Sequence, residues 1–145
     1  MPPALRASTS PILQDTCAAL WLMAGASMSP ESLNAIRAAR RANLGIYVSP
    51  FTAWEVGTLV AKGRVQLTLA PDVWFAELLA QPGVRLAPLT SAELLASTAL
   101  PGTPPSDPAD RIIAATARLH GHIIVTRDRK LLTYAKKGHV RVQAC

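Results

Sequence analysis

Cysteine is scarce in this sequence. Its two cysteines, Cys17 and Cys145, lie near opposite ends of the 145 residues and show no framework spacing. This excludes a small disulfide-stabilised secreted domain and predicts free thiols in a reducing cytoplasm. The apolar stretch at residues 17–26 is shorter than the roughly 20 residues that a membrane helix requires. The sequence therefore predicts a cytoplasmic protein that does not enter a membrane.

Acidic residues are also few in this sequence. Nine Asp and Glu stand against 15 Lys and Arg, which gives a formal net charge of +6 at pH 7. This balance favours a polyanionic partner such as a nucleic acid. A basic protein without such a partner would have the same composition, and that alternative stays open.

Apolar residues make up 50% of the sequence, which excludes a disordered or fibrous chain. A chain of this length can bury about two thirds of its unfolded surface without disulfides. Residues 1–10 are polar and rich in proline, so we expect a disordered tail there. Residues 11–145 are expected to form a single domain.

Strand and helix patterns alternate along the chain, which predicts an α/β protein with a parallel sheet covered on both faces. The expected strands are residues 11–15, 46–49, 84–89, 123–125 and 140–142. The expected helices are residues 16–24, 30 to about 42, 50 to a stop at Gly63, 71–80, a helix capped by Thr90 through Ser97, 110–120, and a short Lys-rich helix after the fourth strand.

Four acids lie where these elements begin or end. Asp15 ends the first strand, and Asp128 comes just after the fourth. Asp110 opens the helix that leads into the fourth strand, and Glu55 lies within two turns of the end of the second. Because ligands of open parallel sheets bind beyond the carboxyl ends of the strands, we expect these four side chains to converge.

Four converging carboxylates repel one another unless a cation or partial protonation relieves the repulsion. A site of oxygen ligands without His or Cys favours Mg²⁺ or Mn²⁺ over Zn²⁺. Three of the acids have simpler interpretations. Glu55 could face solvent on an amphipathic helix, although residues 51–61 contain no other charge. Asp110 could only favour the dipole of its helix, and Asp128 could pair with Arg127 or Arg129. Asp107, before a proline, is expected to cap a helix rather than bind metal.

The remaining polar and aromatic candidates are assigned structural roles. His120, His122 and His139 lack ligand spacing and are expected at the surface or at helix ends. Trp54 and Trp74 fall at helical positions and are expected in the core. The three arginines of residues 37–41 are expected on a solvated helix face.

Four motifs in order resemble the PIN-domain ribonucleases, and among them the VapC-like toxins of bacterial toxin–antitoxin pairs. The motifs are Asp15-Thr16 with Ala19-Leu20-Trp21-Leu22, Ser49 with Ala53-Trp54-Glu55 and Lys62-Gly63-Arg64, Asp107-Pro108-Ala109-Asp110-Arg111 with Ile113-Ala114-Ala115, and Thr126-Arg127-Asp128. The resemblance extends from Ile12 to Val142. Gln14 departs from it, because an apolar residue is usual there, and so does Cys17, where relatives often have His.

The resemblance implies a three-layer α/β/α fold with a central parallel sheet of four to five strands. It also implies an endoribonuclease dependent on Mg²⁺ or Mn²⁺, with a cognate antitoxin as partner, and a homodimer is expected. Asp15, Glu55 and Asp110 would bind the metal or its water shell, and Asp128 would complete the pocket. Thr16 and Thr126 would hold these carboxylates by hydrogen bonds.

Three other functions remain under comparison. The same fold could be a non-catalytic module that binds RNA or protein, or a PIN nuclease of RNA processing without an antitoxin. A phosphorylation receiver domain also has a parallel sheet and an acidic pocket. It requires an Asp at the end of its third strand, whereas this chain has Thr90-Ser91 after residues 84–89, so the sequence argues against it.

Overall fold

The protein is described by a computed structural model that covers residues 10–145. The predicted disordered tail, residues 1–10, lies outside the described residues except for Ser10. The described strands are β1 (Ile12–Gln14), β2 (Ile46–Val48), β3 (Val84–Leu86), β4 (Ile123–Thr126) and β5 (Arg141–Ala144). The described helices are α2 (Thr16–Ala24), α3 (Pro30–Arg41), α4 (Pro50–Ala61), α5 (Pro71–Leu79), α6 (Ser91–Thr98), α7 (Pro108–His120) and α8 (Arg129–Lys136).

The five described strands form one parallel sheet in the order β3-β2-β1-β4-β5. β1 lies at its centre, where Ile12 pairs with Ile46 of β2 on one side and with Ile123 of β4 on the other. The chain runs from β1 outward to β2 and then β3. It then crosses back to the other side of β1, where it forms β4 and β5. The strand order therefore reverses next to β1, which places a binding crevice beyond the ends of β1 and β4.

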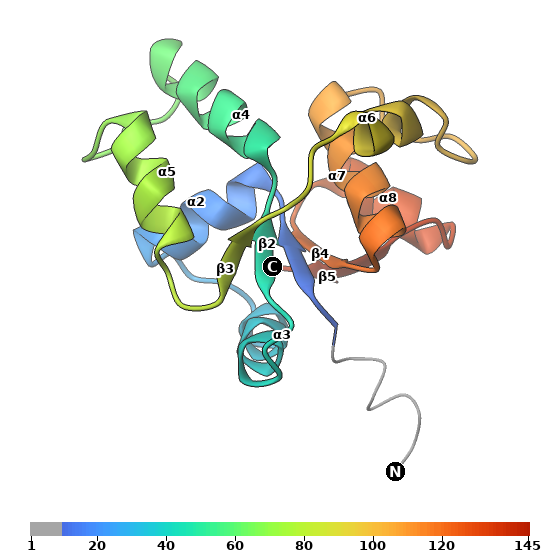
Figure 1. The fold of residues 1–145 in the computed structure, drawn as a ribbon, viewed down its shortest axis with the longest axis horizontal. Helices are drawn as coiled ribbons and strands as arrows, with labels where there is room; N and C mark the ends of the chain where they lie inside the picture. Colours follow the sequence, from blue (N-terminus) through green and yellow to red (C-terminus); the bar gives the residue numbers. More distant parts are fainter. Residues whose placement is uncertain (1–9) are drawn as a thin grey trace.

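Helices cover both faces of the sheet, as Figure 1 shows. Successive strand residues point to opposite faces, so Ile12 packs in one core and Leu13 in the other. The first core receives side chains from α2, α3, α4 and α5, including Ile36 and Leu78. The second receives side chains from α7 and α8, including Ile113. The predicted three-layer fold with a sheet of four to five parallel strands is confirmed.

Most predicted elements lie within two residues of their expected ends, and the larger differences concern the edge strands and α7. β3 stops at Leu86 instead of residue 89 because its neighbour β2 ends at Val48. β5 runs two residues further than expected because it pairs with β4 as far as Thr126. The helix expected at 110–120 begins at Pro108, and Asp107 caps it by accepting from the Ala109 amide at 2.9 Å.

Two of the predicted structural roles are wrong. Trp74 is 5% exposed and belongs to the core as expected, whereas Trp54 is 62% exposed and contacts Phe51 at 5.2 Å between ring centroids. His122 is buried at 4% exposure against the ring of Tyr47, so the expected surface position is wrong, although its amide closes the end of α7 by donating to the Ala117 carbonyl at 3.1 Å. Its position directly before β4 explains the burial, because it lies on the same sheet face as Ile124.

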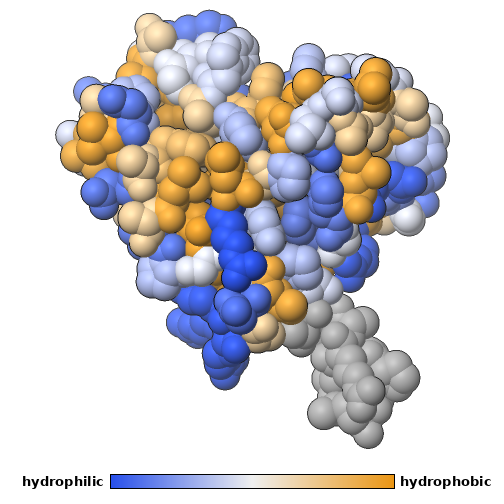
Figure 2. All heavy atoms as spheres, viewed as in Figure 1, coloured by the Kyte–Doolittle hydropathy of each residue, from blue (hydrophilic) through white to orange (hydrophobic). Residues whose placement is uncertain are grey.

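The surface is divided into apolar and hydrophilic regions. The arginines of α3 are exposed as expected, and the surface over that helix is hydrophilic in Figure 2. Hydrophobic residues gather over α5 and α6 in the same view, where Val73 and Leu95 are exposed. Among the described residues, no helix is both long and apolar enough to cross a membrane.

Gln14 is the one residue of β1 that carries a polar side chain into the core. It is 1% exposed, and neither its amide nitrogen nor its amide oxygen has a hydrogen-bond partner. Its strand neighbours in register are Val48 and Val125, both fully buried. Burying an amide without hydrogen bonds costs about 1–3 kcal/mol. This residue, which departs from the family pattern, therefore destabilises the centre of the sheet.

We expect Gln14→Met to raise the free energy of unfolding by about 1–2 kcal/mol, because Met has a similar length and no amide to desolvate. The melting temperature should rise by about 2–4 °C per kcal/mol. Gln143→Met on β5, where the amide nitrogen reaches a main-chain carbonyl, is the control and should change stability by less than about 0.5 kcal/mol. An unchanged or lower melting temperature for Gln14→Met would show that the amide is satisfied.

Candidate active site: a pocket of carboxylates

The central strands place the first acid. Asp15 follows β1 directly, and its amide donates to the Val125 carbonyl of β4 at 3.2 Å. Its side chain caps α2, because Oδ1 accepts from the Ala18 amide at 2.7 Å. Its other carboxylate oxygen, Oδ2, accepts from the Thr126 hydroxyl. Both hydrogen bonds fix the carboxylate at the carboxyl end of the sheet.

The Thr126 hydroxyl links two of the acids. Besides donating to Asp15, it accepts from the amide of Asp128 at 2.9 Å. Asp128 in turn caps α8, since its Oδ1 accepts from the Lys130 amide at 2.7 Å. One side chain at the end of β4 thus holds both the acid after β1 and the acid before α8.

Glu55 reaches the same region from α4. Its Oε1 accepts from the Thr16 hydroxyl at 2.5 Å, and the hydroxyls of Thr16 and Thr52 lie 3.2 Å apart. Thr16 is the first residue of α2, directly after Asp15. The contact therefore joins the acid on α4 to the end of the central strand.

Asp110 comes from the opposite side of the sheet, in the first turn of α7. Its Oδ2 is buried and has no hydrogen-bond partner. A helix-dipole role does not require this burial, since an exposed acid at the same position would serve equally well.

The four acids line one pocket of about 410 Å³. Its walls are formed by Asp15, Thr16, Cys17, Trp21, Glu55, Leu59, Asp107, Asp110, Ile113, Arg127 and Asp128. The structure thus brings together all four predicted acids, whose roles stay predictions. Sequence reasoning missed two members of this wall: Asp107, which it treated only as a cap, and Arg127, which it treated only as a partner for Asp128.

Burial and mutual repulsion perturb three of these carboxyls. The pKa of Asp110 is raised to about 7, first by burial and then by the charges of Asp128, Asp107, Glu55 and Asp15. Burial also raises the pKa of Asp15 and of Glu55, against the opposing effect of their hydrogen bonds to Thr126 and Thr16. The pocket therefore resists carrying its full negative charge.

Within the described part of the chain, no cation forms an ion pair with these carboxylates. Across residues 10–145 the structure contains a single ion pair, His120 with Glu93 at 3.0 Å, which is outside the pocket. The alternative interpretation of Asp128 as an ordinary ion-pair residue is wrong, because neither Arg127 nor Arg129 pairs with it. The buried negative charge is thus left for a ligand to compensate.

The donor atoms suit a hard cation. Five of the lining residues are carboxylic acids, and one of their oxygens, Oδ2 of Asp110, is buried without a partner among the described residues. Cys17 also lines the pocket, but its pKa is raised to about 11 by burial and nearby carboxylates, so its thiol stays protonated at neutral pH. In their present positions no three His, Cys, Asp or Glu side chains of the described residues form a ready metal cluster. Metal binding would therefore require these side chains to move closer.

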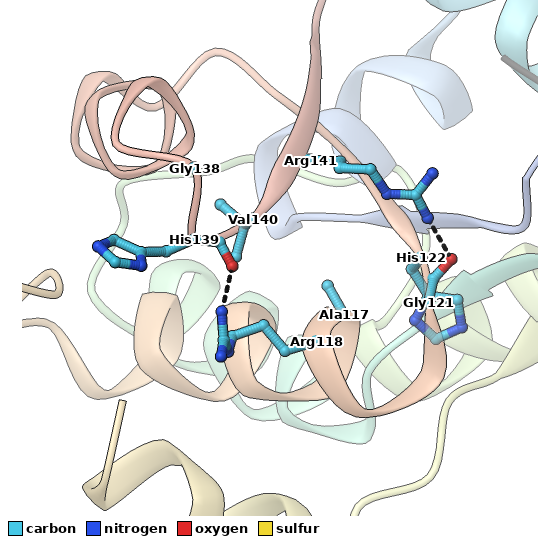
Figure 3. Close-up of a pocket in the computed structure, with 8 residues that line it drawn as sticks. All are labelled: Ala117, Arg118, Gly121, His122, Gly138, His139, Val140 and Arg141. Atoms are coloured by element: carbon cyan, nitrogen blue, oxygen red, sulfur yellow. Dashed lines mark hydrogen bonds between the residues drawn. The ribbon is translucent and has the colours of Figure 1, made fainter. Parts of the chain in front are cut away.

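A second hollow has the opposite electrostatic character (Figure 3). It measures about 270 Å³ and lies near the amino ends of β4 and β5. Each of its two arginines donates to a main-chain carbonyl. Arg118 donates to the carbonyl of His139, and Arg141 donates to that of Gly121 at 2.8 Å. No carboxylate lines it, so this hollow lacks the oxygen ligands that Mg²⁺ and Mn²⁺ prefer.

The sequence matches the PIN domain family over residues 12–137. The chain belongs to the PIN domain family. It is 33% identical over 133 residues to Ribonuclease VapC22 of Mycobacterium tuberculosis, a match that covers 90% of this chain and 97% of that protein. The resemblance to PIN-domain ribonucleases of the VapC type is confirmed.

Solved structures agree with this PIN fold. A chain of VapBC2 from Rickettsia felis, solved with a DNA fragment from its promoter, superposes with a TM-score of 0.65 at 14% identity. That match covers 92% of this chain and 97% of the other. A chain of FitAcB from Neisseria gonorrhoeae gives a TM-score of 0.51 at 22% identity, covering 90% and 95%. At these identities the likeness concerns the fold.

Proposed function

We propose that this PIN domain is a metal-dependent endoribonuclease that hydrolyses RNA phosphodiester bonds, and that it is the toxin of a toxin–antitoxin pair. The observation that carries the proposal is the pocket lined by four carboxylates that form no ion pair among residues 10–145, with an unpaired buried oxygen on Asp110. The similarity to a protein named as a ribonuclease supports RNA as the substrate. The formal net charge of +6 also favours a polyanion.

Asp15, Glu55, Asp110 and Asp128 would hold Mg²⁺ or Mn²⁺, since these ions prefer oxygen ligands. When bound, the ion would supply Lewis-acid polarisation of the phosphodiester and a lower pKa for water. Thr126 fixes the orientation of Asp15, and Thr16 fixes that of Glu55. These hydroxyls fix two of the carboxylates before any ligand arrives, so completing the metal site would require the other acids to move closer to them.

The partner part of the proposal is an antitoxin protein that suppresses the nuclease, together with a homodimer of the chain. The sequence motifs shared with VapC-like toxins support it. The informative observation is the neighbouring reading frame, which should encode a small protein with a DNA-binding pattern. Co-expression should then yield a complex with little nuclease activity, whereas a partner that binds without inhibiting would contradict this part of the proposal.

We expect the purified chain to cleave single-stranded or structured RNA in Mg²⁺ or Mn²⁺, and EDTA to abolish the cleavage. Cleavage should return when an excess of Mn²⁺ is added to the EDTA-treated protein, which separates metal removal from damage to the enzyme. Labelled RNA followed on denaturing gels gives the measurement. Binding without metal-dependent cleavage would instead favour the non-catalytic module.

A further inference from the structure

Among residues 10–145, Arg127 is the only cation in the wall of the carboxylate pocket. Its Nε donates to the main-chain carbonyl of Cys145 at 2.6 Å, and its Nη2 donates to that of Ser27 at 2.9 Å. The guanidinium also lies over the ring of Trp21, with 3.8 Å between its carbon and the ring centroid. Two carbonyls and an aromatic face therefore fix its position and orientation.

This arrangement directs the guanidinium away from the carboxylates beside it. Arg127 pairs with none of them, although Asp128 is the next residue in the chain. An arginine has five N–H donors, and the two described hydrogen bonds use one donor on Nε and one on Nη2. Nη1 has no hydrogen-bond partner among residues 10–145. A fixed cation with free donors thus stands at the edge of an acidic pocket.

The fixed guanidinium also has a structural effect, because it joins the loop before α3 to the end of β5. That role accounts for the two carbonyl contacts. It does not account for the free Nη1, or for a cation in the wall of the pocket that leaves the carboxylates unpaired. Because Arg127 is exposed, a negatively charged ligand that enters the same pocket can reach these free donors.

We propose that Arg127 forms a phosphate-binding subsite for the RNA backbone, next to the phosphate that is cleaved. This inference rests on the proposed nuclease function and adds a substrate contact to it. The planar guanidinium can donate two parallel hydrogen bonds to the non-bridging oxygens of a phosphate, a geometry that Lys cannot reproduce. The subsite would hold the chain of the substrate while the carboxylates and their metal act on the adjacent phosphate.

The subsite should act on binding more than on chemistry. A flanking phosphate carries the same charge before and during the reaction, so the contact stabilises the bound substrate and the transition state equally. Losing such a contact raises KM and leaves kcat nearly unchanged. We therefore expect Arg127→Gln to raise KM for RNA about tenfold and to change kcat less than threefold, whereas Arg127→Lys should fall between Arg127→Gln and the wild type.

The experiment uses a fluorescently labelled single-stranded oligoribonucleotide of mixed sequence. Cleavage kinetics in Mg²⁺ or Mn²⁺ give kcat and KM, and the dissociation constant is measured in an Asp15→Asn background from about 50 to 200 mM salt. In that background Arg127→Gln should reduce the slope of log affinity against log salt by about 0.7 to 1, as expected for one lost phosphate contact. Melting curves in EDTA report how far the variant weakens the fold.

Arg129→Gln is the matched control. It removes the same charge from an exposed residue two positions along the chain, which is outside the pocket wall and makes no described hydrogen bond. Its KM should stay within about twofold of the wild type. Equal KM values and equal salt slopes for Arg127→Gln and Arg129→Gln would overturn the subsite, as would a loss confined to kcat. If Arg127→Gln does not fold, an unchanged KM in a folded Arg127→Lys would overturn it.

Failure of the subsite is distinguishable from failure of the nuclease. A wild-type protein that cleaves no RNA in any metal contradicts the proposed function. A wild-type protein that cleaves RNA, with an Arg127→Gln variant that behaves like Arg129→Gln, contradicts only the subsite.

Discussion

Asp15→Asn is expected to lower RNA cleavage to the level that remains in EDTA. The substitution removes the charge of the acid at the end of the central strand, and under the proposed function the metal would lose a ligand. Cleavage rates at increasing Mn²⁺ measure the effect. The rate of the variant should stay low even at the highest metal concentration.

The fold of this variant should remain intact, which makes the result interpretable. Asn caps helices as well as Asp does, so its side-chain oxygen can still accept from the Ala18 amide. The Thr126 hydroxyl has lone pairs that can accept from the new amide group. Because burial raises the pKa of Asp15, removing its charge should not lower stability in EDTA at neutral pH.

Asp72→Asn is the control for the loss of one negative charge. Asp72 is an exposed acid in the first turn of α5, outside the pocket. Its substitution should leave cleavage unchanged. A cleavage rate for Asp15→Asn equal to that of the wild type at saturating metal would mean that the catalytic centre lies elsewhere.

The sequence predicted the sheet and its acids well because both depend on local patterns. Short apolar segments before Asp15 and Asp128 indicated strand ends, and an acid at the carboxyl end of a parallel strand lies next to the crevice beyond the sheet. Proline after a capping residue, as at Ser49-Pro50, located the helix starts. These signals need no knowledge of distant contacts.

The features that the sequence did not reveal depend on neighbours that are distant along the chain. Arg127 belongs to the pocket because carbonyls about 100 and 18 residues away hold it, and no local pattern specifies them. The sequence marked Gln14 as a departure from the family pattern, but the lack of a partner for its amide depends on Val48 and Val125 on either side of it. Trp54 has an ordinary helical position, and only the packing of α4 leaves it exposed.

Asp110→Asn is expected to remove most of the stabilisation that Mn²⁺ gives to the folded protein. An ion that binds only the folded state raises stability in proportion to the logarithm of its concentration divided by its dissociation constant. Losing a side chain that coordinates the ion weakens its binding and therefore reduces the shift in melting temperature. Melting curves of the wild type and the variant, each in EDTA and in Mn²⁺, measure this shift in melting temperature. The wild type should gain clearly from Mn²⁺, and the variant little.

The same variant should be at least as stable as the wild type in EDTA, and the pH dependence gives the reason. The pKa of Asp110 is raised to about 7 in the folded protein, above its ordinary value of 3.8. Between these two values the folded state binds more protons than the unfolded state, so stability falls as pH rises from about 4 to about 7. Asp15 and Glu55 contribute in the same direction, since their pKa values are also raised. Asp110→Asn should therefore weaken this decline without removing it.

A helix-dipole role for Asp110 predicts the opposite sign. In that case Asp110→Asn would lose about 0.3–1 kcal/mol in EDTA at neutral pH, and its response to Mn²⁺ would equal that of the wild type. Asp72→Asn provides the reference, because Asp72 lies in the first turn of a helix that also begins with proline but is remote from the pocket. Its substitution should show the small dipole loss and an unchanged metal response. If Asp110→Asn matched Asp72→Asn in both measurements, Asp110 would be a helix-terminal acid and not a metal ligand.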